Sequence, residues 1–266
     1  MTEAHLQSAA LTDTRIIVFS DLDGALLDHD GYSFAAAKPA LAALAEQGIP
    51  VVATSSKTLA ELEVLVPEMG LSAAAIGENG AVMKFEDGTI DRAVSRADIA
   101  AAVNTLSAPL RDAMQCFCDM QLNEIAALTG LDHSSAERAA MREASEPFLW
   151  RGNMAGLAAL GDILAAHDLQ LTQGGRFFHI VPPRDKAAAM QTMLARFDAP
   201  PQSWALGDGP NDVSMLLAAD RGALIANRHL DTQSLLPGDH WLYLSRREGA
   251  AGWCDAIAVF LADQFG

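Results

Sequence analysis

Two aspartates separated by one residue follow the first apolar run of the chain. Asp21 and Asp23 open the segment DLDGALL (residues 21–27), directly after the β-branched run at residues 15–20, which predicts a buried strand. Ligands of doubly wound α/β sheets bind at the carboxyl ends of the strands, so this position favours a chemical role for the two carboxylates. An ordinary turn is the alternative for this segment taken alone, because Asp and Gly are common turn residues.

A second acidic cluster, GDGPND at residues 207–212, also stands where a predicted strand gives way to a predicted helix. Asp208 and Asp212 would lie beside Asp21 and Asp23 if both strands are central. Converging carboxylates repel one another unless a cation lies among them, and hard oxygen ligands of this type select Mg²⁺. The alternative is a helix cap with a second aspartate in the first helical turn, which explains either carboxylate but not two such clusters.

Lys186 and Ser55 are two further polar residues at predicted element ends. Lys186 opens a predicted helix, where the helix dipole disfavours a cation, so a phosphate or the acidic cluster is its expected partner; a solvated lysine is the alternative. Ser55 follows the strand predicted at residues 50–54 and precedes a helix, so its hydroxyl and the nearby amides are suited to cradle a phosphate. A serine at this place is equally common as a simple helix cap.

Strands and helices alternate in the first and the last part of the chain, which predicts an α/β fold with a doubly wound, mostly parallel sheet. We expect strands at residues 15–20, 50–54, 73–76, 81–85, 203–206, 222–225 and 242–244, and helices at residues 39–47, 58–69, 186–197, 211–218 and 253–260. Thr58 and Glu61 form a capping box at the start of the second helix. The turn at residues 86–88 is expected to fold the strand before it into a hairpin.

The rhythm changes from about Arg96 and returns after Pro182 and Pro183. Between these points we expect helices at residues 97–106, 122–128, 134–145 and 154–167, and short strands at residues 114–117, 148–150, 169–172 and 177–181. This mixture predicts an inserted α+β module. We therefore expect a core domain formed by residues 1–88 and 185–266, and an inserted domain at residues 89–184.

The composition excludes several classes of partner. The chain has 266 residues, half of them hydrophobic, with 18 basic and 34 acidic side chains and a formal net charge of −16. A field of this sign repels phosphate backbones and anionic lipids, so we expect no nucleic acid and no membrane as partner. A small phosphorylated substrate remains compatible, because local cations or a metal can reverse the sign inside one pocket.

The N-terminal segment and the cysteines predict the location of the protein in the cell and the state of its thiols. Residues 1–14 show neither the basic nor the apolar region of a signal peptide, and no apolar run is long enough to span a membrane, so we expect a cytoplasmic protein. Cys116, Cys118 and Cys254 favour buried free thiols over a disulfide framework or a zinc site.

Together, these elements in this order resemble the four motifs of the haloacid dehalogenase (HAD) superfamily of phosphohydrolases. The insert resembles the C2-type cap domain of the Cof-like subfamily. Within that subfamily the chain is most similar to the mannosyl-3-phosphoglycerate phosphatase family, over a region from about Phe19 to Trp253. The similarity lies in the runs SSKT (55–58), ENG (78–80), EASEPF (143–148), GGRF (174–177) and GDGPND (207–212).

The resemblance implies roles for the core residues. It makes Asp21 the nucleophile and Asp23 the general acid and base, with Ser55 and Lys186 completing the catalytic set. It implies Mg²⁺ as the cofactor, bound by Asp21, Asp208 and the backbone carbonyl of Asp23. Two further residues, Asn211 and Asp212, are expected to contact these ligands and hold them in position without binding the metal themselves. The family usually has threonine where this chain has Ala25.

The resemblance also implies a substrate. It predicts a phosphatase that releases phosphate from a glycosyl-glycerate, mannosyl-3-phosphoglycerate or its glucosyl analogue, in mannosylglycerate biosynthesis. Ser56, Lys57 and Arg176 are the expected substrate-binding residues. Arg176 is shaped to bind a carboxylate with two hydrogen bonds, although pairing with a glutamate of the insert is the alternative. His179 is expected to be a packed strand residue, and His29 part of a solvated loop.

Two other functions stay open at this point. One is a HAD phosphatase for a different sugar phosphate. The other is a phosphorylatable signalling module, because receiver domains also place an acceptor aspartate in an acidic, Mg²⁺-binding pocket. The insert, Asp23 and the late Asp208 cluster argue against the signalling module.

Overall fold

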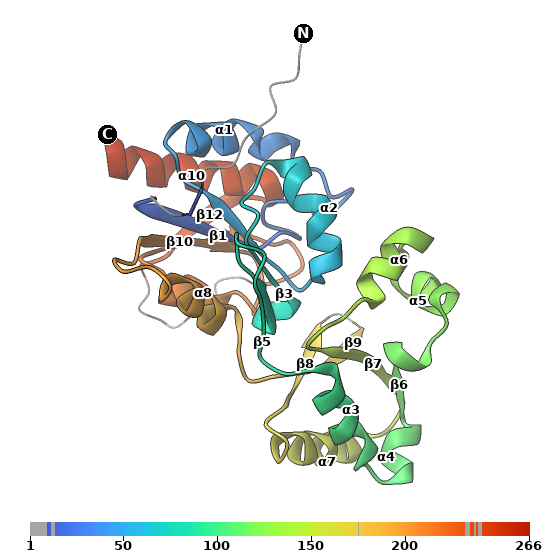
Figure 1. Cartoon of the computed structure of the whole chain (residues 1–266). Helices are drawn as coiled ribbons and strands as arrows, with labels where there is room; N and C mark the ends of the chain where they lie inside the picture. The colour runs from blue at the N-terminus through green and yellow to red at the C-terminus, as the bar shows by residue number, and fades with distance from the viewer. Residues whose placement is uncertain (1–9, 12–13, 175, 232–234, 237, 239–240) are drawn as a thin grey trace.

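Two β-sheets organise the chain in the computed structural model, which describes residues 10–11, 14–174, 176–231, 235–236, 238 and 241–266 (Figure 1). Residues 1–9 of the segment searched for a targeting pattern, and Gly175 of the GGRF run, lie outside the described residues. The larger sheet contains, in spatial order, β12 (Tyr243–Glu248), β11 (Arg221–Ala226), β10 (Gln202–Gly207), β1 (Ile16–Ser20), β2 (Val51–Thr54), β3 (Ala75–Gly77), β4 (Val82–Lys84) and β5 (Ile90–Arg92).

The larger sheet is parallel from β12 to β3, and β4 and β5 form the antiparallel hairpin expected around residues 86–88. Strand β1 lies between β10 and β2 and is buried throughout. Its side chains alternate between the two faces: Ile16 and Val18 join one apolar cluster, whereas Ile17 and Phe19 join another. A central strand buried on both faces confirms the predicted α/β fold.

Helices cover both faces of the larger sheet, as a doubly wound fold requires. One face carries α1 (Lys38–Glu46), α2 (Leu59–Met69) and α10 (Gly249–Phe265), and the other carries α8 (Lys186–Leu194) and α9 (Val213–Ala218). The capping box of Thr58 and Glu61 is present at the start of α2, as predicted. None of the described helices is long and apolar enough to cross a membrane.

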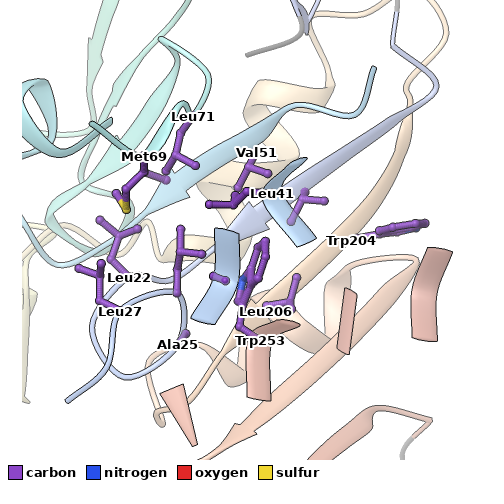
Figure 2. Packing of buried hydrophobic residues seen from close by; sticks show 14 of the residues in the cluster. Leu22, Ala25, Leu27, Leu41, Val51, Met69, Leu71, Trp204, Leu206 and Trp253 are labelled. Atoms are coloured by element: carbon purple, nitrogen blue, oxygen red, sulfur yellow. The ribbon is translucent and has the colours of Figure 1, made fainter. Parts of the chain in front are cut away.

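The loop after β1 is anchored in the core by its apolar residues. Leu22, Ala25 and Leu27 pack beside Leu206 and Trp253 in the larger apolar cluster (Figure 2). The alternating acidic residues of the same loop are therefore held at the edge of the sheet by side chains that point inward.

The second sheet belongs to the insert. It contains β6 (Met114–Cys116), β7 (Glu146–Trp150), β9 (Phe177–Val181) and β8 (Gln170–Gly174) in that spatial order, with antiparallel pairs throughout. The accompanying helices are α3 (Arg96–Asn104), α4 (Ala108–Asp112), α5 (Leu122–Thr129), α6 (His133–Ala140) and α7 (Met154–Ala165). Residues of α3 and α7 share one apolar cluster with the sheet, and residues of α5 and α6 form another with Leu149 and Phe177.

Three details differ from the expectation. The larger sheet continues through β5 to Arg92, so the chain leaves it a few residues after the expected boundary at 88/89. Cys118 is exposed, although burial was expected. The helix expected at residues 134–145 ends at Ala140, because the next residues turn toward the larger sheet and donate hydrogen bonds to it.

Glu78 receives those hydrogen bonds. It lies in the short 3₁₀ helix η3 (Glu78–Gly80) between β3 and β4 and is buried. Its carboxylate accepts the N–H groups of Glu143 at 2.7 Å and Ala144 at 3.2 Å, and the hydroxyl of Ser145. A carboxylate that receives three donors is well satisfied despite its burial, so Glu78 holds the insert against the core.

We predict that Glu78→Gln loosens this contact. The new amide group would place a donor opposite N–H donors, which costs about 1–3 kcal/mol of unfolding free energy at a buried site. Hydrogen exchange at the amides of residues 143 and 144 should accelerate, and urea unfolding should start earlier. The matched control is Ser145→Ala, which removes one donor and leaves both N–H bonds in place; equal exchange rates in the two variants would contradict this role of Glu78.

Candidate active site

The carboxyl ends of β10, β1 and β2 lie side by side, and the predicted site residues leave from this edge. Asp21 follows β1, Ser55 follows β2 and Asp208 follows β10. Lys186 is the first residue of α8, and Asp212 is the residue before α9. Carboxylate oxygens of Asp21, Asp208 and Asp212 lie within 4.8 Å of one another. The sheet therefore brings together the two acidic clusters, as the strand-end argument predicted.

Lys186 joins the two clusters. Its side chain is completely buried, and its Nζ donates to Oδ1 of Asp21 and to Oδ1 of Asp212, at 2.6 Å in each case. Burial alone would lower the pKa of Lys186, but the two carboxylates outweigh that effect and raise it above the usual value. The alternative of a solvated lysine is therefore wrong.

Asp212 serves the loop that precedes it. Its Oδ2 accepts the N–H groups of Asp208 and Gly209, each at 3.0 Å, and its side chain makes no capping bond to α9. Gly207 permits this arrangement, since a Cβ there would lie 2.4 Å from the Asp212 carboxyl carbon. The helix-cap alternative is therefore wrong for Asp212, which orients the Asp208 backbone.

Asp208 has two neighbours that the sequence analysis missed. Asn227 Nδ2 donates to its Oδ2 at 2.6 Å, and His29 Nε2 lies 3.2 Å from the same oxygen. His29 is thus packed on the site and does not belong to a solvated loop. Gly24, with φ of +82°, allows the close approach, because a Cβ there would lie 2.3 Å from Asp208 Oδ2. Burial, followed by repulsion from Asp212, raises the pKa of Asp208 to about 7.

Asp23 is held by Lys57. The Lys57 ammonium donates to Asp23 Oδ2 at 2.8 Å and lies 5.4 Å from the ring centroid of Tyr32. The second oxygen of Asp23 is buried and makes no hydrogen bond. Burial would lower the pKa of Lys57, yet the contact with Asp23 raises it, so Lys57 remains a cation. One Asp23 oxygen is thus left for a further partner.

The loop after β2 links the site to the insert. The Ser55 side chain is buried, and its hydroxyl accepts the N–H of Lys57 at 3.3 Å. The carbonyl of Ser56 accepts a hydrogen bond from Nη1 of Arg142, a residue of the insert, at 2.9 Å. Ser55, Ser56 and Lys57 therefore lie between the acidic clusters and the insert.

Two predicted residues make their contacts elsewhere. Asn211 donates to the side chain of Asn79 at 3.1 Å, and none of the described hydrogen bonds joins its side chain to an acidic residue. Arg176 is exposed in the insert and donates to the carbonyl of Leu128 at 2.6 Å, so it pairs with no glutamate either. The structure brings neither side chain to the cluster around Asp21.

Comparison with known proteins agrees with this geometry. Residues 18–141 match the family model described as haloacid dehalogenase-like hydrolase, and residues 151–261 match that of sucrose-6F-phosphate phosphohydrolase. Both matches support a hydrolase of the haloacid dehalogenase superfamily.

Solved structures of the superfamily share the whole HAD fold with this chain. The sucrose-phosphatase from Synechocystis sp., in complex with sucrose and phosphate, is 16% identical with a TM-score of 0.65, over 92% of this chain and 98% of that chain. A HAD phosphatase from Bacteroides thetaiotaomicron is 18% identical with a TM-score of 0.65, over 98% and 96%. A HAD subclass IIB sugar phosphatase is 15% identical with a TM-score of 0.62, over 93% and 98%.

The acidic cluster of this HAD protein fits a magnesium ion. Asp21, Asp208 and Asp212 are buried, so their carboxylates repel one another at short range, and the buried Lys186 ammonium offsets part of this charge. The carboxylate oxygens of these three residues are hard donors, the type that Mg²⁺ prefers. Asp212 is already occupied by Lys186 and two N–H groups, which leaves Asp21 and Asp208 as the side chains best placed to hold a metal.

A second group of potential ligands lies in the insert, but its chemistry disfavours a metal. Cys116, Cys118 and Glu146 have ligand atoms within 4.8 Å of one another. Burial and the Glu146 charge raise the pKa of Cys118 to about 11, so the thiolate form is suppressed at neutral pH. The Glu146 carboxylate is engaged by Arg96 at 2.6 Å and by the Cys118 N–H at 3.0 Å.

The raised pKa of Asp208 predicts how metal binding depends on pH. Between pH 3.8, the usual value, and about 7, folded Asp208 holds a proton that the unfolded chain releases, so its contribution to stability is lost as pH rises through this window. A metal must displace this proton. We expect the rise in melting temperature caused by Mg²⁺ to be larger at about pH 8 than at about pH 5.5. Burial also raises the pKa of Asp21, so in Asp208→Asn the pH-dependent part of the rise should become smaller, and an unchanged rise there would contradict the assignment.

Proposed function

We propose that this protein is a Mg²⁺-dependent phosphatase that hydrolyses the phosphate monoester of a glycosyl-glycerate, mannosyl-3-phosphoglycerate or its glucosyl analogue. The observation that carries the phosphatase chemistry is the buried Asp21 carboxylate, bound to Lys186 beside Asp208 and close to the loop of Ser55. Support for a sugar phosphate comes from the match to sucrose-6F-phosphate phosphohydrolase and from the sugar phosphatases of similar fold. The glycerate part rests on the sequence runs shared with the mannosyl-3-phosphoglycerate phosphatase family.

In the first step Asp21 attacks the phosphorus atom. A new bond forms between a carboxylate oxygen and phosphorus, and the bond from phosphorus to the sugar or glycerate oxygen breaks. Asp23 donates a proton to the departing oxygen. Burial raises the pKa of Asp21, and the Lys186 ammonium opposes this by favouring the ionised carboxylate. Lys186 also fixes one Asp21 oxygen at 2.6 Å, which leaves the other for the attack.

In the second step water hydrolyses the aspartyl-phosphate. Asp23, deprotonated by the first step, takes a proton from the water, whose oxygen attacks phosphorus as the bond to Asp21 breaks. Inorganic phosphate leaves and the carboxylate of Asp21 is restored. The Ser55 hydroxyl and the Lys186 ammonium bind the phosphoryl oxygens, whose negative charge would otherwise repel the nucleophile.

The metal would be held by Asp21, Asp208 and the backbone carbonyl of Asp23. When bound, Mg²⁺ supplies charge neutralisation at the phosphoryl oxygens. The Asp212 carboxylate accepts the N–H of Asp208, and the Asn227 amide donates to Asp208 Oδ2. These two hydrogen bonds fix Asp208 for this purpose.

A phosphatase for another sugar phosphate is the second candidate, favoured by the match of residues 151–261 to sucrose-6F-phosphate phosphohydrolase. A panel of phosphate esters decides between the two candidates by the substrate with the highest kcat/KM.

Substitution of Asp21 and substitution of Asp23 should impair different steps of the reaction. Asp21→Asn should abolish formation of the aspartyl-phosphate with every substrate, a loss of roughly 10³-fold or more in kcat. Asp23→Asn should still transfer phosphate from aryl esters, whose leaving groups need no proton, and then stall at the intermediate. The measurement is burst kinetics with p-nitrophenyl phosphate against steady-state turnover of a sugar phosphate; equal losses on both substrates in Asp23→Asn would remove its role as acid and base.

Metal removal gives an independent test. Activity on any phosphate ester should vanish in excess EDTA and return with Mg²⁺, whereas Ca²⁺ should support it poorly because its larger and looser coordination misaligns the attack. Circular dichroism in EDTA is the control that the fold survives. Full turnover in EDTA with the fold intact would refute the metal-dependent mechanism.

A further inference from the structure

Arg142 is a buried cation with unused donors. It lies in the segment between α6 and β7, and its side chain is only 9% exposed. Its Nη1 donates to the Ser56 carbonyl at 2.9 Å, while its Nε is buried and makes no hydrogen bond. Guanidinium groups are almost never this deeply buried without a partner anion, because the loss of hydration is costly.

The described part of the chain supplies no anion to Arg142. Each ion pair found there joins other residues, and the nearby Glu146 carboxylate is engaged by Arg96 at 2.6 Å and by the Cys118 N–H. Arg142 therefore makes no direct ion pair with the described residues, and its charge acts on Glu146 only at longer range. Such a charge is stabilised when a ligand brings a carboxylate or a phosphate to it.

The position of Arg142 indicates which group of a bound substrate would lie near it. Its partner Ser56 directly follows Ser55, the residue expected to bind the phosphoryl group, and consecutive Cα atoms are about 3.8 Å apart. Lys57, the next residue, contacts Asp23, the expected proton donor to the leaving group. Arg142 is thus bound to the loop segment that joins the expected phosphoryl site to the expected proton donor.

His179 borders the same place. It is paired with Pro147 in the register of β7 and β9 and lies on the sheet face opposite to Phe178 and Ile180, which pack in the α3 and α7 cluster. Burial and the charge of Arg142 lower its pKa to about 4, so the ring is neutral at physiological pH. A neutral imidazole can exchange hydrogen bonds with a polar ligand without adding a second charge.

We infer that Arg142 is the receptor for a carboxylate on the leaving group of the substrate, and that it, and not Arg176, selects phosphate esters of hydroxy acids. This inference rests on the proposed phosphatase function and deepens it. In a 3-phosphoglycerate the carboxylate carbon is three bonds from the ester oxygen, a separation comparable to the step from Ser55 to Ser56. The planar guanidinium, whose Nε makes no hydrogen bond, has the shape for a bidentate pair with such a group.

The decisive experiment compares two substrates that differ in the carboxylate. D-3-phosphoglycerate carries it, and glycerol 3-phosphate has a hydroxymethyl group in its place. We expect the ratio of their kcat/KM values to favour 3-phosphoglycerate in the wild type and to fall by about 10²-fold in Arg142→Met, with partial recovery in Arg142→Lys. Arg151→Met, the same substitution at an exposed arginine of the insert, should leave the ratio unchanged.

A purely structural role of Arg142 predicts a different pattern. If it only docks the insert through Ser56, Arg142→Met should lower both kcat/KM values in parallel, as Glu78→Gln should by loosening the contact between insert and core. A parallel loss would overturn the inference. It would also be overturned if Arg176→Met, and not Arg142→Met, collapsed the ratio, or if the wild type showed no preference for the carboxylate.

A binding measurement separates this inference from the proposed function. If the wild type hydrolyses no phosphate ester with Mg²⁺ present, the phosphatase function fails. Calorimetric titration with 3-phosphoglycerate and with glycerol 3-phosphate then still tests Arg142. Tighter binding of 3-phosphoglycerate that is lost in Arg142→Met supports the carboxylate receptor, and equal binding in the two proteins refutes it.

Discussion

The Lys186 ammonium between Asp21 and Asp212 is the interaction on which the site depends. It places one buried positive charge among three buried carboxylates, so removal of Lys186 would leave anions that repel one another in a region of low dielectric constant. Several backbone features serve this contact. Helix α8 begins at Lys186, and Gly80 lets η3 press against the backbone of Asp185, where a Cβ would lie 2.3 Å from the carbonyl oxygen. The same 3₁₀ helix carries Glu78, so the element that positions the lysine also receives the insert.

The loop after β2 couples the insert to the chemistry through three consecutive residues. The Ser55 hydroxyl lies at the expected phosphoryl site, the Ser56 carbonyl binds Arg142 of the insert, and the Lys57 ammonium binds Asp23. A movement of the insert therefore acts on the phosphoryl site and on the proton donor through the same short backbone segment. This connection would let the insert, none of whose described residues joins the cluster of Asp21, Asp208 and Asp212, affect the proposed reaction.

The sequence predicted those parts of the site that follow from strand order alone. Asp21, Ser55 and Asp208 follow neighbouring parallel strands, and the carboxyl-end rule places them together without knowledge of any side-chain contact. Asn227 directly follows β11, so the same rule could have predicted it as a site residue. It was missed because no acidic residue stands beside it in the sequence. Glu78 and Arg142 were not accessible, because their roles are contacts across more than sixty residues of sequence that local patterns do not encode. The helix expected to run to Ser145 failed for the same reason: Glu78 takes the N–H groups that would have continued it.

Ala25 shows which interactions shape the nucleophile loop when the threonine usual at this position is missing. The loop is closed by its own backbone, with the Gly24 N–H donating to the Leu27 carbonyl at 2.9 Å and the Leu27 N–H donating to the Leu22 carbonyl at 2.7 Å. The Ala25 side chain is fully buried and packs in the apolar cluster of Figure 2. Upstream, Trp253 donates to Ser20 at 2.9 Å, and Ser20 donates to the Asp21 carbonyl at 2.7 Å. None of these contacts needs a hydroxyl at position 25, so the substitution leaves in place every hydrogen bond that holds Asp21 and Asp23 at the edge of the sheet.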